Sequence, residues 1–527
     1  MFLKNALRNF YLNSTLYDKK ISKFSNTRLE YSPSINLLNC LIKNRNKKIK
    51  IEDLHLNSVW QEKALSTKDH KNLHSFFWLF SLDLKSSKKL TQSVLENWIN
   101  NNKDYSKENW QIDILSKRVI AWISNSKLTY EESEWQYKDK FIKIIQKQAN
   151  HLVNEIENSE WVDDKMIGCT AIILTGITFD EKTRYLNFGF NLLKKIINLS
   201  FDQENFPKTR SIRQLNFYLK HFVLIREWLK ESQNEIPNYL DEAIFYLGQA
   251  YSITSKNIKK NALFNGSHEA DSCDFDGYLK LHGYKFNNLS HEIGGYAVLK
   301  DKKICLIMDI GESPEKKFSK DYQCGALSFE IISNHKKLIC NSGFFQKDNH
   351  RFNMISRSTA TQSTLIIDNH SSCIINPKNF KIEQGLKILK KKITFNKNHW
   401  SICASHDGYS KRYGIIHERQ LDFFPNTNKL IGKDRLIKKK NFKSTKFDIR
   451  FHLEPNIKIM KTQDRKSILI DIENEGWKFT ALGCNIDVEI GLYFGKKNSF
   501  TSNQNLFITG ITNNEEQIIE WEFNRIS

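Results

Sequence analysis

The spacing of apolar residues changes once along this 527-residue chain, and that change limits most strongly the folds it can adopt. From about residue 36 to 255, apolar side chains recur every three to four positions, which places them on one face of a helix. From about residue 276 they alternate with polar side chains, as in a strand with one buried face. The sequence therefore predicts a helical half followed by a half of antiparallel strands.

The helical half divides into amphipathic segments joined by short polar stretches, an arrangement typical of antiparallel helical hairpins. Trp78, Trp98 and Trp122 have helical spacing, so we expect them in the core rather than stacked on a ligand. The predicted helices are two within 73–99 with a break near Ser86–Ser87, then 109–125, 137–158, 165–177, 183–199, 211–231 and 237–253.

The second half contains around a dozen strand patterns with no helix between them, which indicates antiparallel sheets stacked on each other. The boundary lies in the Gly-, Asp- and Ser-rich stretch 261–278. The predicted domains are an N-terminal extension (1–35), a helical domain (36–260), a junction (261–278) and a β-sandwich (279–527). The predicted strands are 296–311 with a turn at 301–303, 326–333, 336–343, 363–369, 400–409, 413–424, 445–453, 467–482, 486–495 and 517–526.

A formal net charge of +21 favours a polyanionic partner, such as nucleic acid, anionic lipid or acidic polysaccharide. The alternative is a set of solvated lysines on helix faces. The basic runs 43–50 and 435–443 lack interleaved aromatic residues, and no zinc-finger, RRM or KH signature occurs. Specific nucleic-acid binding is therefore the poorest of the three functions weighed below.

Nine cysteines, an odd number without a CxxC motif, are expected to be buried free thiols of a reducing compartment. The first residues contain no apolar run long enough for a signal peptide, and no stretch is apolar enough to span a membrane. These patterns favour the cytoplasm.

The stretch 405–419, "SHDGYSKRYGIIHER", carries most of the residues that could do acid–base chemistry. His406, Tyr409 and His417 offer imidazole and phenol groups, and Arg419 shares a strand face with His417. We expect this face to point into a groove. The alternative is a hairpin with half-buried aromatic residues and a turn at Asp407–Gly408.

Two further loops carry polar candidates. Arg357 in "ISRSTATQSTL" could pair bidentately with a carboxylate, although it could equally be a surface arginine. His268 and Glu269 lie in the junction, where a cleft is expected, and Tyr278 ends it. No GxSxG, P-loop or dinucleotide-binding motif occurs.

Seven local motifs, in order, resemble the heparinase II/III-like family of bacterial polysaccharide lyases, closest to its α-proteobacterial subgroup. They are "LHSFFWLFSLDL", "RVIAWI", "LFNG", "GALSFEI" with "NSG", "QSTLIID", "SHDGY" with "YGIIHER", and "DRL" with "RFHL". The resemblance runs from about residue 60 to the C-terminus. It implies an incomplete (α/α) toroid followed by an antiparallel β-sandwich, with an acidic glycan in a groove between them.

The resemblance also implies β-elimination at a uronate-type sugar. A base removes the proton beside the carboxylate, an acid protonates the leaving oxygen, and a further group neutralises the carboxylate. The candidates for acid–base roles are His406, Tyr409, Gln362 and His417, and those for substrate binding are Arg357, Arg210, Gln323, Asn341 and Arg419. Arg210 is chosen because the loop before its helix matches a groove-facing family position, and Arg213 and His221 follow it.

The resemblance implies that metal-bearing lyases of this family carry an H-x-H-x-D motif before the "LSF" strand. They also carry an Asp near the end of the next strand and a later His. Aligning on Leu327–Phe329 puts Asp321 and Gln323 at the two histidines. It puts Asn341 at the aspartate and Gln362 at the later histidine. Neutral amides are poor ligands for zinc-type metals, so we expect no metal cofactor.

Two functions follow from the resemblance. The first is a metal-independent lyase for an acidic polysaccharide, and the alternative is a non-catalytic protein that binds acidic glycan or assists envelope polysaccharide assembly. The family usually acts in the periplasm or cell envelope, against the cytoplasmic location that the missing signal peptide and free thiols favour.

Overall fold

The structure is a computed structural model that describes the chain except residues 1, 26, 35–37, 39–59, 61–65, 83–86, 180–181, 257–260, 270–274, 348, 439–442, 465 and 474. The basic run 43–50, Cys40 and Cys273 therefore lie outside the described residues. Among the helices that are described, none is long and apolar enough to cross a bilayer.

Two compact units make up the chain, and they interleave in sequence. Unit 1 comprises residues 1–199, 217–245 and 272–284, and unit 2 comprises residues 200–216, 246–271 and 285–527. The predicted domain boundaries, which are linear, stay predictions. The segments that carry Arg210 and His268 belong to unit 2 and are described with its sheets.

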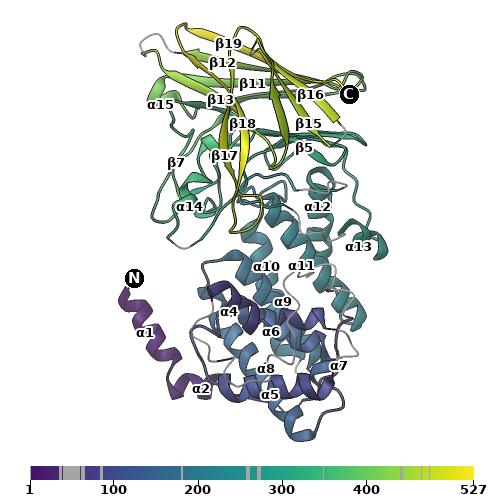
Figure 1. Ribbon diagram of the computed structural model, residues 1–527. Coiled ribbons are helices and arrows are strands. Elements are labelled where there is room, and N and C mark those ends of the chain that lie inside the picture. The colour runs from purple at the N-terminus through teal and green to yellow at the C-terminus, as the bar shows by residue number, and fades with distance from the viewer. Residues whose placement is uncertain are drawn as a thin grey trace. The chain divides into compact units, whose positions relative to one another are not determined.

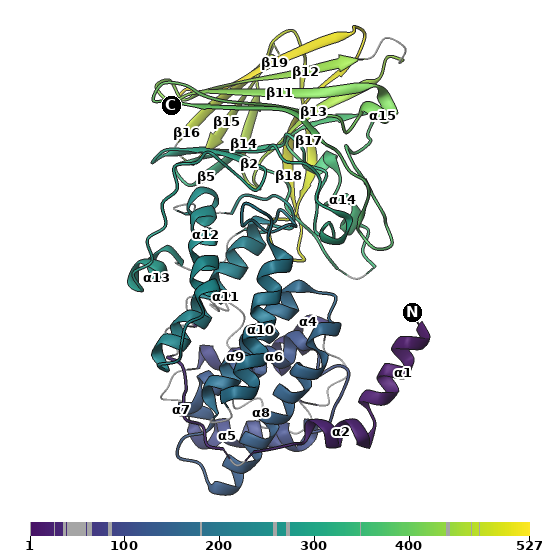
Figure 2. The ribbon, with the colours of Figure 1, turned by 180° about the vertical axis from the view of Figure 1, so that it is seen from behind.

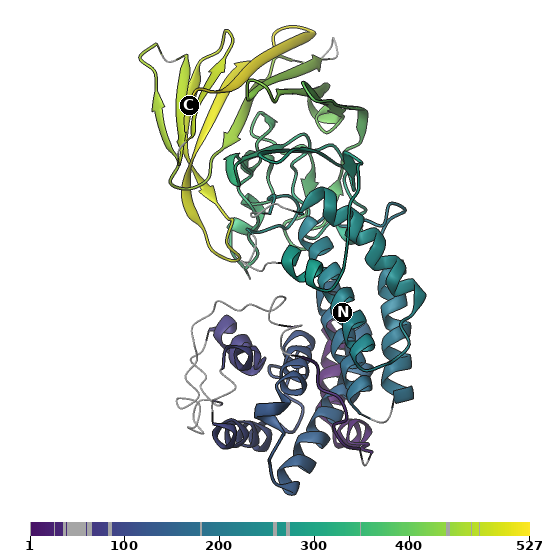
Figure 3. The same cartoon turned by 90° about the vertical axis from the view of Figure 1, so that its right-hand side faces the viewer.

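Helices form unit 1, and the longer ones run beside one another (Figure 3). α6 packs on both α8 and α9, and their apolar stripes supply the buried core, with Trp98 and Trp122 edge to face at 5.4 Å. Along the chain the helices are α1 (Phe2–Leu12), α2 (Thr15–Ile21), α4 (Thr67–His74), η3 (Phe77–Ser81), α5 (Lys88–Asn102), α6 (Ile112–Ser124), α7 (Ser126–Thr129), α8 (Trp135–Glu155), η4 (Ile156–Asn158), α9 (Val162–Thr178), α10 (Lys182–Ser200), α11 (Ile212–Glu231), α12 (Asn238–Thr254) and α13 (Phe275–Leu281).

Most predicted helices are confirmed to within a few residues, but one is wrong. Residues 75–82 do not form the expected α-helix: α4 ends at His74, and Phe76 at φ +57° turns the chain into the short η3. Trp78, Trp98 and Trp122 are buried, as expected for core residues. Ser87 caps α5 by accepting a hydrogen bond from the amide of Leu90, which confirms the predicted break before it.

Unit 2 consists of antiparallel sheets. A five-stranded sheet has the order β1–β2–β3–β4–β5, an eight-stranded sheet has the order β14–β15–β16–β19–β12–β11–β10–β9, and a four-stranded sheet has the order β17–β18–β13–β6. Figures 1 and 2 both show β11, β12 and β19 side by side. The bounds are β1 (Glu292–Ile293), β2 (Tyr296–Lys300), β3 (Ile304–Asp309), β4 (Phe329–Ser333), β5 (Lys336–Ile339), β6 (Leu365–Ile367), β7 (Ile374–Ile375), β8 (Ile382–Gln384), β9 (Ile388–Phe395), β10 (Trp400–His406), β11 (Ile415–Phe424), β12 (Lys429–Lys438), β13 (Lys446–His452), β14 (Lys458–Lys461), β15 (Ser467–Ile472), β16 (Glu475–Ala481), β17 (Ile486–Tyr493), β18 (Thr501–Ile511) and β19 (Glu516–Arg525).

These three sheets share one apolar core, which includes Leu306, Phe329, Leu421, Phe451 and Trp521. The alternating pattern predicts that β4 has only one buried face. This prediction is wrong, because all residues of β4 are buried. Glu330 on the second face is fully buried and pairs with the equally buried Lys337 at 2.8 Å. A charge pair of this kind is tolerated in an interior because each ion supplies the other's missing solvation.

Candidate functional site

The acid–base candidates of the stretch 405–419 form one buried network inside unit 2. β10 and β11 pair so that His406 lies opposite His417, and β11 and β12 pair so that Arg419 lies opposite Asp434. His417 Nε2 lies 2.6 Å from Asp434 Oδ1, and His417 Nδ1 lies 3.3 Å from His406 Nε2. Arg419 donates to both carboxylate oxygens of Asp434, at 2.8 and 3.0 Å.

The hydrogen bonds of this network assign its protons. His406 Nδ1 accepts from the amide of Gly408, so its proton lies on Nε2 and points to His417 Nδ1. His417 then donates through Nε2 to Asp434, whose other oxygen accepts from the Trp521 indole at 2.8 Å. Both imidazoles are satisfied as neutral groups, and an added proton would find no acceptor.

Burial sets the pKa values of the network. It lowers the pKa of His406, and the neighbouring His417 and Arg419 add to this effect. Burial also lowers the pKa of His417, although Asp434 opposes it. For Asp434, burial would raise the pKa, but the Arg419 guanidinium and His417 outweigh it and hold the carboxyl ionised.

The expectation that His417 and Arg419 point into a groove is wrong. They do share one strand face, but this face is the interior, where both side chains and His406 are almost completely buried. Tyr409 is buried as well, and its hydroxyl donates to the carbonyl of Leu365 at 3.1 Å. Direct contact between these four residues and a polymer would require the core to open.

Gln323, Asn341 and Gln362, the positions that the resemblance assigns to lost metal ligands, do lie close together. Asn341 Oδ1 accepts from the amide of Ser363, next to Gln362, and Gln323 donates to the carbonyls of Gly343 and Ser356. The Gln362 side chain lies over Gly325, where an added Cβ would be 3.1 Å from Gln362 Oε1. All three side chains are buried.

In this structure the three amides join loops by hydrogen bonds. Gln323 alone connects three segments, because its Oε1 also accepts from the amide of Gly266. Within the described residues, no group of three or more His, Cys, Asp or Glu side chains could hold a metal ion. The amide nitrogen of Asn341 is the one polar atom of the three side chains that is buried without a hydrogen-bond partner there.

Arg357 and Arg210 are buried, and their N–H groups are engaged by the protein itself. Arg357 donates to the carbonyls of Lys320, Phe345 and Asn353 and to Gln346, while its guanidinium lies over Phe344 at 4.5 Å. Burial lowers its pKa to about 10. Arg210 pairs with the buried Asp309 at 2.6 Å and donates to carbonyls of the 294–295 and 311–312 turns. Substrate binding by either arginine stays a prediction that this geometry does not favour.

Three other candidates from the sequence form a partly exposed cluster in unit 2, which we name the Arg213 cluster: Arg213, His268 and Asp321. Arg213 pairs with Asp321 at 3.6 Å, with the side chains 27% and 19% exposed. Asp321 packs against Gly266, where a Cβ would lie 2.9 Å from its own, and Gly266 adopts φ +78°.

His268 completes the Arg213 cluster. Its Nδ1 is buried and has no hydrogen-bond partner among the described residues. Burial, then the positive charges of Arg213 and Lys497, lower its pKa to about 3. The imidazole is therefore neutral at pH 7, and its Nδ1, which is closed off from solvent, keeps a lone pair without a partner among the described residues. Glu269, beside it, instead accepts a hydrogen bond from the Tyr493 hydroxyl at 2.7 Å.

Residues 289–522 match the family described as Heparinase II/III-like, C-terminal. This part of the chain therefore belongs to the heparinase II/III-like C-terminal domain family. The matched residues include the strands of the five-, eight- and four-stranded sheets, except for the last three residues of β19. The resemblance of the local motifs is thereby confirmed.

Solved structures similar to this chain include a heparinase III, with a TM-score of 0.70 and 14% identity over 100% of this chain and 90% of that chain. Heparan sulfate lyase HepC from Pedobacter heparinus aligns with a TM-score of 0.65 and 13% identity, over 99% of this chain and 88% of that one. These likenesses confirm the fold class, a helical region followed by antiparallel sheets. No curated protein sequence gives a significant match.

Two features of the site escaped the sequence analysis. β12 was not predicted, and with it Asp434, the carboxylate that both His417 and Arg419 contact, was missed. The signal was the alternation of Leu430, Gly432, Asp434 and Leu436, all buried, but a glycine and an aspartate interrupt its apolar face. In the 206–221 segment, Arg210 was chosen although Arg213 is the more exposed arginine.

Proposed function

We propose that this heparinase II/III-like protein cleaves an acidic polysaccharide by β-elimination. The observation that supports this most directly is the family match of residues 289–522, together with the likeness of the whole chain to heparan sulfate lyases. The net charge of +21 suits a polyanionic substrate. The Arg213 cluster supplies the reacting groups in this proposal.

Arg213 would pair with the sugar carboxylate, and its charge would stabilise the negative charge that develops there when the neighbouring C–H bond breaks. Neutral His268 would accept that proton through its unpartnered Nδ1, which is buried here and would have to become exposed when the glycan binds. The C–H electrons form a carbon–carbon double bond and the glycosidic C–O bond breaks. The leaving oxygen takes a proton from water, while His268 holds the proton removed from carbon and later releases it to solvent. A pKa of about 3 makes His268 a weak base in the free protein. A bound anion would raise this pKa, because it would offset the charges of Arg213 and Lys497.

The test is to incubate the protein with a panel of uronate-containing glycans, heparan sulfate included, and to follow the near-ultraviolet absorbance of the unsaturated product. We expect product with at least one glycan, and Arg213→Gln to lower kcat/KM by about 10- to 100-fold, or 1.4 to 2.7 kcal/mol. Arg435→Gln is the matched control. It also breaks an arginine–carboxylate pair, with Glu516 on β12 and β19, but outside the Arg213 cluster. No product from any glycan would contradict the lyase proposal.

The second candidate function is binding of acidic glycan without cleavage. The burial of His406, His417 and Tyr409 favours it, because the imidazoles and phenol predicted to do acid–base work are closed off in the core. Retained binding without product, weakened by Arg213→Gln but not by Arg435→Gln, would support this function. The absence of both binding and product would contradict both candidates.

Location in the cell envelope is also a proposal, and it rests on the family alone. Fractionation of the source cells with an antibody to the chain would test it. Recovery in the cytoplasmic fraction would instead agree with a reducing compartment, since no disulfide links any of the seven cysteines that the structure describes.

A further inference from the structure

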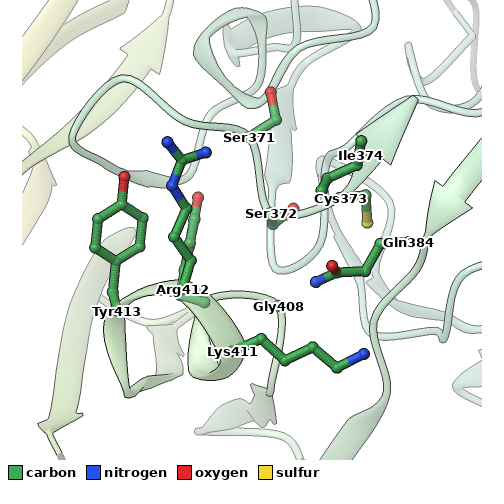
Figure 4. Close-up of a pocket in the computed structure, with 10 residues that line it drawn as sticks. Ser371, Ser372, Cys373, Ile374, Gln384, Gly408, Lys411, Arg412 and Tyr413 are labelled. Carbon is green, nitrogen blue, oxygen red and sulfur yellow. The ribbon is translucent and has the colours of Figure 1, made fainter. Parts of the chain in front are cut away.

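A pocket of about 240 Å³ opens on unit 2 beside the turn that joins β10 to β11 (Figure 4). It shares no residue with the Arg213 cluster, and it adjoins the buried network at Gly408 and Tyr409. The lining comes from three segments: residues 371–374, Gln384 at the end of β8, and residues 408–413, which include α15 (Ser410–Tyr413). Pockets for drug-sized ligands measure about 300–1,000 Å³, so this one suits a single sugar ring.

The lining is positively charged and contains no acidic residue. Lys411 and Arg412 are exposed, and no carboxylate pairs with either of them among the described residues. Figure 4 shows Arg412 pointing toward Ser371 and Lys411 reaching toward Gln384, from two sides of the opening. This separates the two cations instead of placing them on one patch.

Neutral donors stand beside the cations. The Ser371 hydroxyl oxygen accepts from the amide of Thr359 at 3.0 Å, which leaves its O–H to donate. The Gln384 side-chain amide has no partner among the residues described, and Figure 4 shows its nitrogen directed into the opening. Four side chains thus offer donors to a molecule in the pocket, and no lining side chain carries a negative charge.

The frame around these donors is rigid. Gly408 lies against the Ser372 carbonyl, where a Cβ would meet the oxygen at 2.6 Å. The Ser372 hydroxyl lies 3.3 Å from that of Thr359, and Gly414, with φ +64°, follows the last residue of α15. The Tyr409 ring is buried behind the pocket and fixed by its hydrogen bond to Leu365. Little ordering of the backbone is therefore needed when a ligand binds.

We propose that this pocket binds one oxyanion-bearing sugar unit, through Lys411 and Arg412 at the anion and through Ser371 and Gln384 at ring hydroxyls. The choice of a sugar rests on the proposed acidic-glycan function, whereas the choice of an oxyanion rests on the lining alone. The anion is a carboxylate or a sulfate, which both present oxygens that a guanidinium and an ammonium pair with. The site would hold a glycan chain at a second point, away from the Arg213 cluster.

The test is calorimetric or NMR titration of the full chain with glucuronate, glucosamine 6-sulfate, glucose and sodium sulfate. We expect one or both anionic sugars to bind more tightly than glucose and than inorganic sulfate. The double variant Lys411→Ala/Arg412→Ala should weaken that binding at least tenfold. The stronger of the two anionic sugars identifies the anion.

Lys302→Ala/Lys303→Ala is the matched control, since it removes the same charge from the exposed β2–β3 turn, and we expect its affinity to stay within twofold. Equal weakening in both double variants, equal binding of glucose or of sulfate alone, or no binding by the unmodified protein would each overturn the proposal. A monosaccharide has no glycosidic bond to cleave, so the result does not depend on lyase activity, and failure here would leave the proposed function standing.

Discussion

The stretch 405–419 supplies basic residues to two places with opposite properties. His406, His417 and Arg419 point into the core of unit 2, where Asp434 and each other satisfy them. Lys411 and Arg412, only a few residues away, point outward into an open pocket without a carboxylate partner among the described residues. Each set contains an arginine, and the two arginines, Arg419 and Arg412, differ in their environment and not in their chemistry.

This difference shows what a basic residue needs in order to act on another molecule. A buried ion is costly to desolvate, so it persists only where protein groups replace the lost water, and those groups then occupy its donors. The N–H groups of Arg419 donate to Asp434 and to the carbonyls of Leu327 and Ser363. The N–H groups of Lys411 and Arg412 form no ion pair with a described carboxylate, so the pocket is the better place to look for a ligand.

Asp434→Asn should have the largest effect, because it leaves Arg419 as an uncompensated buried charge. Breaking a buried ion pair from one side costs about 3–5 kcal/mol. The free energy of unfolding of the transition that includes unit 2, measured in guanidinium, should fall by this amount. Asp422→Asn is the control, since Asp422 pairs with His399 at a partly exposed position of β11. The control variant should lose less than about 1 kcal/mol of unfolding free energy. An equal decrease in the two variants would contradict the distinction between the two regions.

Lowering the pH should reduce the free energy of unfolding by an intermediate amount, through the buried histidines. Burial holds the folded pKa values of His406 and His417 below the ordinary 6.5, so the folded protein binds fewer protons than the unfolded chain. Their contribution is complete above pH 6.5 and is lost as the pH falls toward the folded pKa values. For each pH unit below 6.5, each of these histidines lowers the free energy of unfolding by at most about 1.4 kcal/mol. The groups that face the pair are Arg419, Asp434, Glu418 and Tyr409.

His406→Asn sharpens this test, because Asn keeps an acceptor for the Gly408 amide but does not titrate. Guanidinium unfolding at pH 7.5, 6.5 and 5.5 should show a shallower decline for this variant than for the unmodified protein. His335→Asn, at the exposed turn before β5, serves as the control. The same decline in all three proteins would contradict a neutral, buried His406.

The sequence predicts these two regions unequally well. The period-two pattern locates β10 and β11 and places His417 and Arg419 on one face, because apolar neighbours such as Leu421 and Phe423 mark that face clearly. How this inward face accommodates His417 and Arg419 was not predictable from β11 alone. It depends on Asp434, which lies on β12, a strand whose inward positions include Gly432 to make room for Trp521. Long-range pairing of this kind leaves no local signal.

The lysine-rich β9 was missed for a related reason. Ile388–Phe395 is largely exposed at the edge of the eight-stranded sheet, so the alternation that marks a half-buried strand is absent there. For the Arg213 cluster, the sequence identified all three residues as polar candidates. Their proximity arises from contacts between segments more than 50 positions apart, and neither period nor motif encodes it.

The smallest effect on stability should come from Lys411→Ala/Arg412→Ala. Both side chains are exposed and form no ion pair with a described residue, so their removal breaks no desolvated contact. Surface changes of this kind stay within about 0.5 kcal/mol. Guanidinium unfolding should therefore place the double variant beside the unmodified protein and beside Lys302→Ala/Lys303→Ala. A decrease in stability near that of Asp434→Asn would mean that Lys411 and Arg412 also stabilise the core. Weaker sugar binding by the Lys411→Ala/Arg412→Ala variant would then result from damage to the fold and not from the loss of a binding site.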